Sequence, residues 1–358
     1  MKTLMTISLI ILMSLTNLYA IEPKLDEDED SGESSKVEKE VKEILEKTHD
    51  EDFNREEIVN ELAEYGTQIV NILLTELYNE DEEIVIVSAF ALDKIYGEKA
   101  LSKIVKAYIK RLPNNEIYEL TNFIIEKEDK TLPHLSKEFA TQEEDVRYEL
   151  VKIIAKIETK NSLEILSEIF NDEPAENIKF RIIELTYEKD EGNQKKYLEY
   201  AYSLLDAQNF SIKCDAIKIL GIAKDTSKME SLQNWAVDEN LNIRKAAITA
   251  LSKIGTESAI AVVINSLQHE CKFTRFCAAD MLVEVETKDE IIKEKIFNAM
   301  VKVLEDDYEL VRLSGIVYFS KTMDKRGIPY LEKVAENDPD DWNMMQAKDV
   351  LVKLYRKF

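Results

Sequence analysis

The sequence is poor in the residues that end helices and close tight turns, with 8 glycines and 6 prolines among 358 residues. A sheet protein of this length, with its many tight turns, would need more of both. Leucine, isoleucine, lysine and glutamate are abundant instead, and all but isoleucine are strong helix formers. We therefore expect an all-α protein.

Residues that carry common chemistry are also scarce. The three histidines, His49, His134 and His269, lie far apart in the sequence. No glycine-rich phosphate loop, serine-hydrolase, zinc-protease or calcium-binding motif is present. Runs such as DEDED are typical of a solvated surface rather than of a catalytic carboxylate pair. We expect a protein without catalytic residues, cofactor or metal, and the sequence assigns no binding residues.

Positive charge is deficient, because 47 lysines and arginines stand against 71 aspartates and glutamates, for a net charge of −24. Such a field repels a phosphate backbone, which argues against a nucleic-acid partner. It attracts basic or positively patched proteins. After the N-terminal segment no apolar run is long enough to span a bilayer, so no transmembrane segment is expected after cleavage.

The N-terminal segment differs from the rest of the chain. Lys2 is its one charged residue, an apolar run extends from Leu4 to Leu15, and Ala20 offers a small residue for cleavage. This arrangement is typical of a secretory signal peptide. We predict a signal peptide at 1–20 and a periplasmic or extracellular protein, with an uncleaved anchor as the alternative.

The next segment is acidic, with KLDEDEDSGESS at 24–35. Such a run cannot bury apolar surface, so we predict a disordered linker at 21–35. Val37, Val41, Ile44 and Leu45 then form one apolar stripe at helical spacing. We expect this helix to open the folded region, residues 36–358.

A large core residue recurs through this region at intervals of 30 to 37 residues. Nine of the ten are large and apolar, and Thr186 is the exception. The ten are Leu62, Leu92, Phe123, Ile154, Thr186, Leu220, Leu251, Leu282, Phe319 and Leu351. Small residues stand four places earlier in six repeats, at Ser88, Ala216, Ala247, Ala278, Gly315 and Ala347. This spacing keeps one face of a helix apolar and lets a second helix approach closely.

Prolines and glycines give an independent check on the repeat. Pro133 and Pro329 each follow a core residue by ten positions, and proline is tolerated in the first turn of a helix. Gly66, Gly97 and Gly255 lie where the first helix of a repeat should end. Each repeat is therefore predicted to be a helix–turn–helix unit, which must stack on its neighbours to bury its apolar stripe.

The repeats resemble the HEAT family, and in particular the short HEAT-like repeats of phycobilin lyases. The residues that carry the resemblance are NIRKAAITALSKIGTESAI at 242–260, EEIVIVSAFALDKIYGEKAL at 82–101, EDVRYELVKIIAKIETKNSL at 144–163 and ELVRLSGIVYFSKTMDKRGIPYL at 309–331. The resemblance implies a right-handed α-solenoid of about ten repeats. The match is weakest at 175–210, where we expect a distorted repeat.

Arginines recur near the start of the first helix, as Arg147, Arg244, Arg275 and Arg312. They could form an anion-binding ladder. The resemblance implies the alternative, a structural ladder of hydrogen bonds to acidic or amide side chains. Asp145, Asn242 and Glu309 are the nearest candidates.

The three cysteines, Cys214, Cys271 and Cys277, could give one disulfide or remain free thiols. We expect Cys277 in the core and Cys271 in the preceding turn. His269, Cys271, Cys277 and Asp280 match no zinc-site spacing.

Aromatic residues could anchor a partner or fill the core. The candidates are Tyr197, Tyr200, Tyr202, Trp235 and Trp342. Helical spacing favours the core. Second helices are expected to line the concave face, where an exposed aromatic would serve as an anchor.

Three functions remain open. The first is an exported, noncatalytic scaffold that binds a protein partner along the concave face. The second is an enzyme or cofactor-handling protein, by analogy of fold with the bilin lyases. The third is a structural component that associates with itself through its end repeats. The oligomeric state is not predicted.

Overall fold

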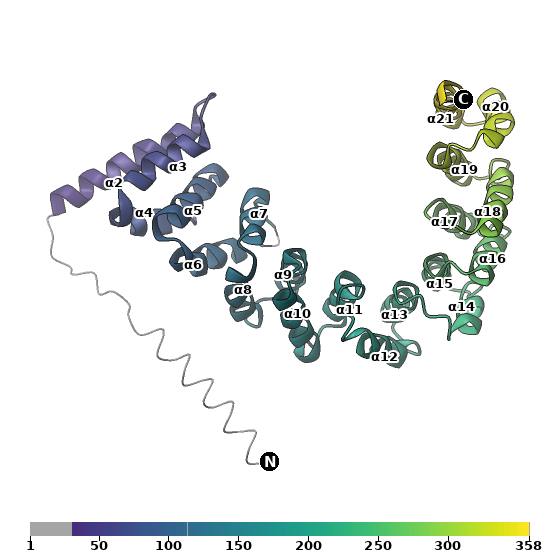
Figure 1. Ribbon diagram of the computed structural model, residues 1–358, viewed down its shortest axis with the longest axis horizontal. Coiled ribbons are helices and arrows are strands. Elements are labelled where there is room, and N and C mark those ends of the chain that lie inside the picture. Colours follow the sequence, from purple (N-terminus) through teal and green to yellow (C-terminus); the bar gives the residue numbers. More distant parts are fainter. Residues whose placement is uncertain (1–30, 113, 358) are drawn as a thin grey trace, which may run out of the picture. The chain divides into compact units, whose positions relative to one another are not determined.

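The structure is a computed structural model that describes residues 31–112 and 114–357. These residues form α-helices and short 3-10 turns and contain no strand (Figure 1). They divide into two compact units, one that ends at Ala107 and one that begins at Tyr108. No helix in the described part of the chain is both long and apolar enough to cross a membrane. The predicted signal peptide lies outside the described residues.

Each of the ten predicted core residues falls in a separate helix, and we call these ten the first helices. Helices α3 and α5 lie in the first unit and the other eight in the second. They are α3 (Arg55–Glu64), α5 (Glu82–Tyr96), α7 (Tyr118–Glu126), α9 (Glu144–Ile157), α11 (Glu176–Thr186), α13 (Phe210–Ile222), α15 (Leu241–Ile254), α17 (Lys272–Val283), α19 (Glu309–Thr322) and α21 (Asp341–Lys357).

A second helix follows each first helix except α21 within the described residues. These second helices are α4 (Val70–Glu76), α6 (Glu98–Ile109), α8 (Leu132–Phe139), α10 (Lys160–Asp172), α12 (Gln194–Leu204), α14 (Met229–Trp235), α16 (Glu257–Ser266), α18 (Glu290–Val303) and α20 (Ile328–Asn337). The predicted all-α solenoid of about ten repeats is therefore confirmed.

All ten core residues are buried, with no side chain more than 8% exposed. The polar exception, Thr186, is 1% exposed and donates a hydrogen bond from its hydroxyl to the Ile182 carbonyl oxygen, 2.7 Å away. A buried hydroxyl must be hydrogen-bonded, and this one is satisfied within its own helix. Threonine can therefore occupy the core position without disturbing the repeat.

The turn signals also lie where the sequence predicts them. Pro133 and Pro329 fall in the first turn of α8 and α20. Gly66, Gly97 and Gly255 adopt φ values of 61°, 58° and 69°, which glycine reaches without a steric penalty. They lie between the two helices of their repeats, as predicted.

The start of the folded region differs from the prediction. Helix α2 (Ser31–Glu46) begins inside the segment predicted as a disordered linker, while residues 21–30 lie outside the described residues. Val41, Ile44 and Leu45 are buried on the predicted stripe. Once a helix is anchored by such a stripe, its backbone hydrogen bonds can continue into the preceding residues.

The second unit has two layers of helices. Its first helices pack on one another from α9 to α21, whereas neighbouring second helices touch far less. The first helices consequently lie on the inner side of the curve that this unit follows (Figure 1). Our expectation that second helices line the concave face is therefore wrong for this unit. Small residues in the first helices allow the close packing that puts them inside.

Two glycines lie where a helix packs closely on a neighbouring segment. A Cβ atom added at Gly221 of α13 would lie 2.6 Å from the Cα of Ala250 in α15. A Cβ added at Gly315 of α19 would lie 2.7 Å from a methyl carbon of Leu304. The first obstacle is backbone, and the second is the end of a flexible side chain.

We expect Gly221→Ala to lower the free energy of unfolding by about 1–3 kcal/mol, because two helices must separate. This loss should exceed that of Gly315→Ala, although alanine favours a helix over glycine by about 1 kcal/mol at both sites. Urea unfolding of both variants measures the difference. Equal stabilities, or a more stable Gly221→Ala protein, would contradict the proposed close contact.

Candidate functional site

The recurring arginines join neighbouring repeats. Arg312 donates to both carboxylate oxygens of Asp338 at 2.8 Å and to the Asp306 carbonyl oxygen at 2.9 Å. Arg275 binds the Asp306 carboxylate at 2.8 and 3.0 Å, and also contacts Asp307. Each guanidinium thus bonds the turn before its own helix and the turn before the next one.

Arg147 and Arg244 also join neighbouring repeats, through other partners. Arg147 donates to both oxygens of Glu173, at 2.8 and 2.9 Å, and Arg244 donates to the Thr274 hydroxyl at 3.0 Å. The structural ladder is confirmed. The partners Asp145, Asn242 and Glu309 proposed from sequence are wrong, because each guanidinium binds a side chain of the next repeat and carbonyl oxygens in the turn before its own helix.

Two acidic members of this ladder, Asp338 and Asp306, have lowered pKa values. Burial alone would raise the pKa of Asp338, but hydrogen bonds from Arg312 and from the Asp340 N–H, together with the Arg312 charge, bring it below its usual range. The pKa of Asp306 is also lowered, for the same reason, by Arg275.

These shifts predict acid sensitivity. A carboxylate whose pKa is depressed by folding contributes stability above its unfolded pKa of about 3.9, and this contribution is lost as the pH falls through the folded pKa. We expect the free energy of unfolding to decline below about pH 4, and to decline less steeply in Arg312→Met. Urea titrations between pH 7 and pH 2.5 test this, and identical slopes for both proteins would contradict it.

All three cysteines are free. Cys277 is buried in α17, and burial raises the pKa of its thiol to about 11. Cys271 is half-buried at the start of the same helix, with His269 Nδ1 accepting from its backbone N–H. Burial raises the pKa of this thiol, but hydrogen bonds from the Thr274 N–H and hydroxyl, from the Phe273 N–H and from Arg244 together outweigh burial and lower the pKa overall. The predicted positions of both thiols are confirmed.

We expect Cys271 to react with iodoacetamide at pH 8 at least about tenfold faster than Cys277, because the pKa of the Cys271 thiol is lowered, whereas that of Cys277 is raised to about 11 and its side chain is buried. Mass spectrometry of timed samples reports both rates. In guanidinium, where the protein is unfolded, the two thiols should react at similar rates. Equal rates in the folded protein as well would contradict the burial of Cys277.

The aromatic candidates divide between core and surface. Tyr197 is fully buried and donates to Asp190 at 2.7 Å, which confirms the core interpretation there. Tyr200 and Trp235 are half-buried, and Tyr202 donates to Asp225 at 2.7 Å. Trp342, at the start of α21, is 57% exposed and does not belong to the core.

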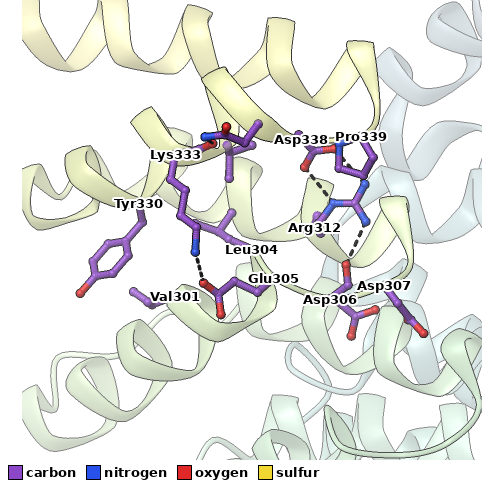
Figure 2. Close-up of a pocket in the computed structure, with 12 residues that line it drawn as sticks. Val301, Leu304, Glu305, Asp306, Asp307, Arg312, Tyr330, Lys333, Asp338 and Pro339 are labelled. Carbon is purple, nitrogen blue, oxygen red and sulfur yellow. Dashed lines mark hydrogen bonds and ion pairs between the residues drawn. The ribbon is translucent and has the colours of Figure 1, made fainter.

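A pocket of about 470 Å³ lies beside the ladder, between α18, α20 and the turn at Asp338 (Figure 2). Its charged groups are paired, Lys333 with Glu305 at 2.6 Å and Arg312 with Asp338. A pocket of about 540 Å³ lies between α16 and α18, one repeat earlier. Because the gap recurs between successive second helices, we attribute it to the separation of that layer rather than to a dedicated ligand.

Exposed residues of the first helices form one stripe along the inner layer. In α15 this stripe holds Asn242, Lys245, Thr249 and Lys253, at nine, six and two positions before Leu251 and two after it. These offsets return to the same face of a helix. Because first helices of neighbouring repeats pack on one another, we infer that their equivalent stripe positions lie side by side.

The first two stripe positions become apolar in the last three repeats. We call these six residues the apolar patch: Phe273 and Phe276 of α17, Leu310 and Leu313 of α19, and Trp342 and Met345 of α21. Phe273, Leu310, Trp342 and Met345 are 49%, 37%, 57% and 44% exposed. The equivalent positions hold Asp145 and Tyr148 in α9. The sequence contained this signal, because Phe273, Leu310 and Trp342 each stand two residues before the position at which the arginines recur.

Two contacts join the helix starts that carry the patch. The Phe273 ring meets the Tyr308 ring edge-on at 6.1 Å, which joins α17 to the residue preceding α19. Asn343 donates from its side chain to the Glu309 carbonyl oxygen at 3.0 Å, which joins α21 to the start of α19. Contiguous exposed apolar surface that crosses several elements marks an interaction site more often than isolated residues do.

Acidic residues lie along both edges of the patch. Glu309 and Asp341 are exposed in the first turns of α19 and α21. On the other edge, Asp280 and Asp349 occupy the next stripe position and are also exposed. Burial and the charge of Glu284 raise the pKa of Asp280. Lys272 in α17 and Val317 in α19 occupy the equivalent edge positions and are exposed too, so four of the six edge positions are acidic.

Comparison with known proteins supports the repeat. Residues 199–283 match the family described as HEAT repeats. No curated protein matches the chain. Among solved structures, an engineered protein is 16% identical, with 88% of this chain and 98% of that chain covered and a TM-score of 0.36.

Two natural proteins are also similar. Human deoxyhypusine hydroxylase is 18% identical, with 81% of this chain and 97% of that chain covered and a TM-score of 0.32. Yeast importin-β (Kap95p) is 11% identical, with 91% and 60% covered and a TM-score of 0.49. The recurring core residues and the stacked helix pairs identify the described part of the chain as an α-helical solenoid, in which residues 199–283 match HEAT repeats.

Proposed function

We propose that the protein is an exported, noncatalytic scaffold that binds a partner protein on the inner layer of its first helices. The observation that carries the proposal is the apolar patch, which spans three successive repeats and exposes four large apolar side chains by more than a third. Such surface is costly to leave in water, at about 25 cal/mol per Å², and is favoured where a partner covers it. HEAT repeats supply the extended surface that such binding needs.

The cofactor-handling alternative gains no support from the described residues. Such a function needs a concave pocket into which polar groups converge. In the pocket beside Arg312 the ionised side chains are engaged with one another, and its counterpart recurs between α16 and α18. The apolar patch, by contrast, leaves large apolar side chains in contact with water, and a protein partner would cover them. We therefore favour a scaffold over an enzyme.

Chemical crosslinking in cell-envelope extract tests the scaffold. The test variant combines Phe273→Ser, Leu310→Asn and Trp342→Asn, which places at these positions residue types that occur there in other repeats, as at Ser211 and Asn242. We expect one reproducible partner with the unaltered protein and its loss with the variant. Phe210→Ser, which removes an exposed aromatic residue outside the patch, is the matched control. No reproducible partner, or recovery unaffected by the variant, would overturn the proposal.

The export proposal needs a separate test, because it rests on the sequence of residues 1–20. We expect the protein isolated from its native cells to lie outside the cytoplasm and to begin at Ile21. N-terminal sequencing of the fractionated protein decides this. Recovery from the cytoplasm with residues 1–20 intact would contradict export, and would leave the binding proposal to its own experiment.

A further inference from the structure

The apolar patch has dimensions that restrict what can cover it. It extends over three helices, and neighbouring packed helices lie about 9–10 Å apart. Seven residues of α-helix rise about 10.5 Å, so a helix laid across the patch presents one apolar position to each repeat. The patch has two rows of side chains. One row, which we call the outer row, holds Phe273, Leu310 and Trp342, and the other row holds Phe276, Leu313 and Met345. Two rows match the apolar stripe of an amphipathic helix.

The charges beside the patch restrict the partner further. Glu309 and Asp341 border one side, and Asp280 and Asp349 border the other. Lys272 occupies the corresponding edge position in α17, and its ammonium lies 4.2 Å from the centroid of the Tyr308 ring. A helix that carries Lys or Arg on both sides of its apolar stripe would meet acid on both edges. A helix with Asp or Glu there would be repelled.

We propose that the apolar patch binds a cationic amphipathic α-helix of a partner protein. This inference rests on the proposed scaffold function and names the chemistry of its partner. The helix lies across α17, α19 and α21, with apolar residues at seven-residue spacing on the patch. Its basic residues pair with Glu309 and Asp341 on one side and with Asp280 and Asp349 on the other. The apolar contacts supply affinity, and the acidic borders select charge and speed encounter.

Synthetic helices test the partner class directly. The probe is a fluorescent 18-residue peptide with leucine along one helical face and lysine elsewhere. A second peptide has glutamate in place of lysine, and a third has the composition of the first in an order that disperses the leucines. Fluorescence anisotropy with the full protein gives each Kd. We expect the first peptide to bind at least about tenfold more tightly than either of the others.

Two variants assign the binding to the patch. The Phe273→Ser, Leu310→Asn, Trp342→Asn protein should bind the first peptide at least about tenfold more weakly, and Phe210→Ser should bind it unchanged. Glu309→Gln combined with Asp341→Asn should weaken binding several-fold at 50 mM salt and less at 300 mM, because exposed charges are screened. Unchanged thermal unfolding shows that the variants remain folded.

Three results would overturn the inference. These are equal binding of the dispersed or the glutamate peptide, unaltered binding by the triple variant, and self-association of the protein that the triple variant abolishes. The last result would assign the patch to a second copy of this chain. If a crosslinked partner depends on the patch while the cationic helix does not bind, the partner class is wrong and the scaffold function stands. If no partner is recovered at all, the scaffold function itself fails.

Discussion

Replacing Arg312 with methionine is expected to lower the free energy of unfolding by about 3–5 kcal/mol. The guanidinium and its partner are both buried, with side-chain exposures of 7% for Arg312 and 1% for Asp338. Methionine fills much of the same volume but leaves the Asp338 carboxylate without its counter-ion and the Asp306 carbonyl oxygen without that donor. Methionine is tolerated at the equivalent position of α21, Met344.

The matched control is Arg326→Met. Arg326 pairs with Asp324 and Glu294 at 2.7 Å, but its side chain is 50% exposed. Exposed pairs contribute about 0–1 kcal/mol, so this variant should be nearly as stable as the unaltered protein. Guanidinium unfolding of both variants measures the contrast. A similar small loss at both sites would mean that the ladder does not hold the repeats together.

Replacing Phe319 with alanine should cost a comparable amount, about 3–5 kcal/mol. Phe319 is fully buried and contacts two other rings edge-on, Phe297 at 5.7 Å and Tyr318 at 5.2 Å between centroids. A Cβ added at Gly327 would lie 2.3 Å from its ring, so the backbone also packs directly on it. Truncation therefore leaves a cavity with little freedom to collapse.

Val317 provides the control within the same helix, because it is 44% exposed on the stripe. Val317→Ala should change stability by no more than about 0.5 kcal/mol. Hydrogen exchange should show that Phe319→Ala weakens protection in α17 and α21 as well as in α19, since each repeat is stabilised by its neighbours. Loss of protection confined to α19 would contradict this coupling.

The repeat could be predicted from sequence because its signals are local. Spacing along a helix decides which side chains share a face, and this placed all ten core residues, Thr186 included. Pro133 and Pro329 marked helix starts because the restriction on proline is also local. Neither inference required knowledge of how the repeats pack.

The ladder partners and the inner layer could not be predicted in this way. Arg275 reaches Asp306 in the following repeat, and sequence spacing within one helix carries no information about that contact. Which layer lies inside depends on how closely helices such as α13 and α15 approach at Gly221. Phe273, Leu310 and Trp342 carried a readable signal, but their exposure followed only from the position of the stripe.

Photo-crosslinking from a single position tests the central claim most directly. Benzoylphenylalanine would replace Met345, which lies in the apolar patch, or Val237, which is 70% exposed after α14 and outside the patch. Irradiation in native cells should join one protein partner to the reagent at position 345 and none at position 237. Crosslinks of equal yield from both positions, or none from position 345, would contradict a partner-binding surface on the last three first helices.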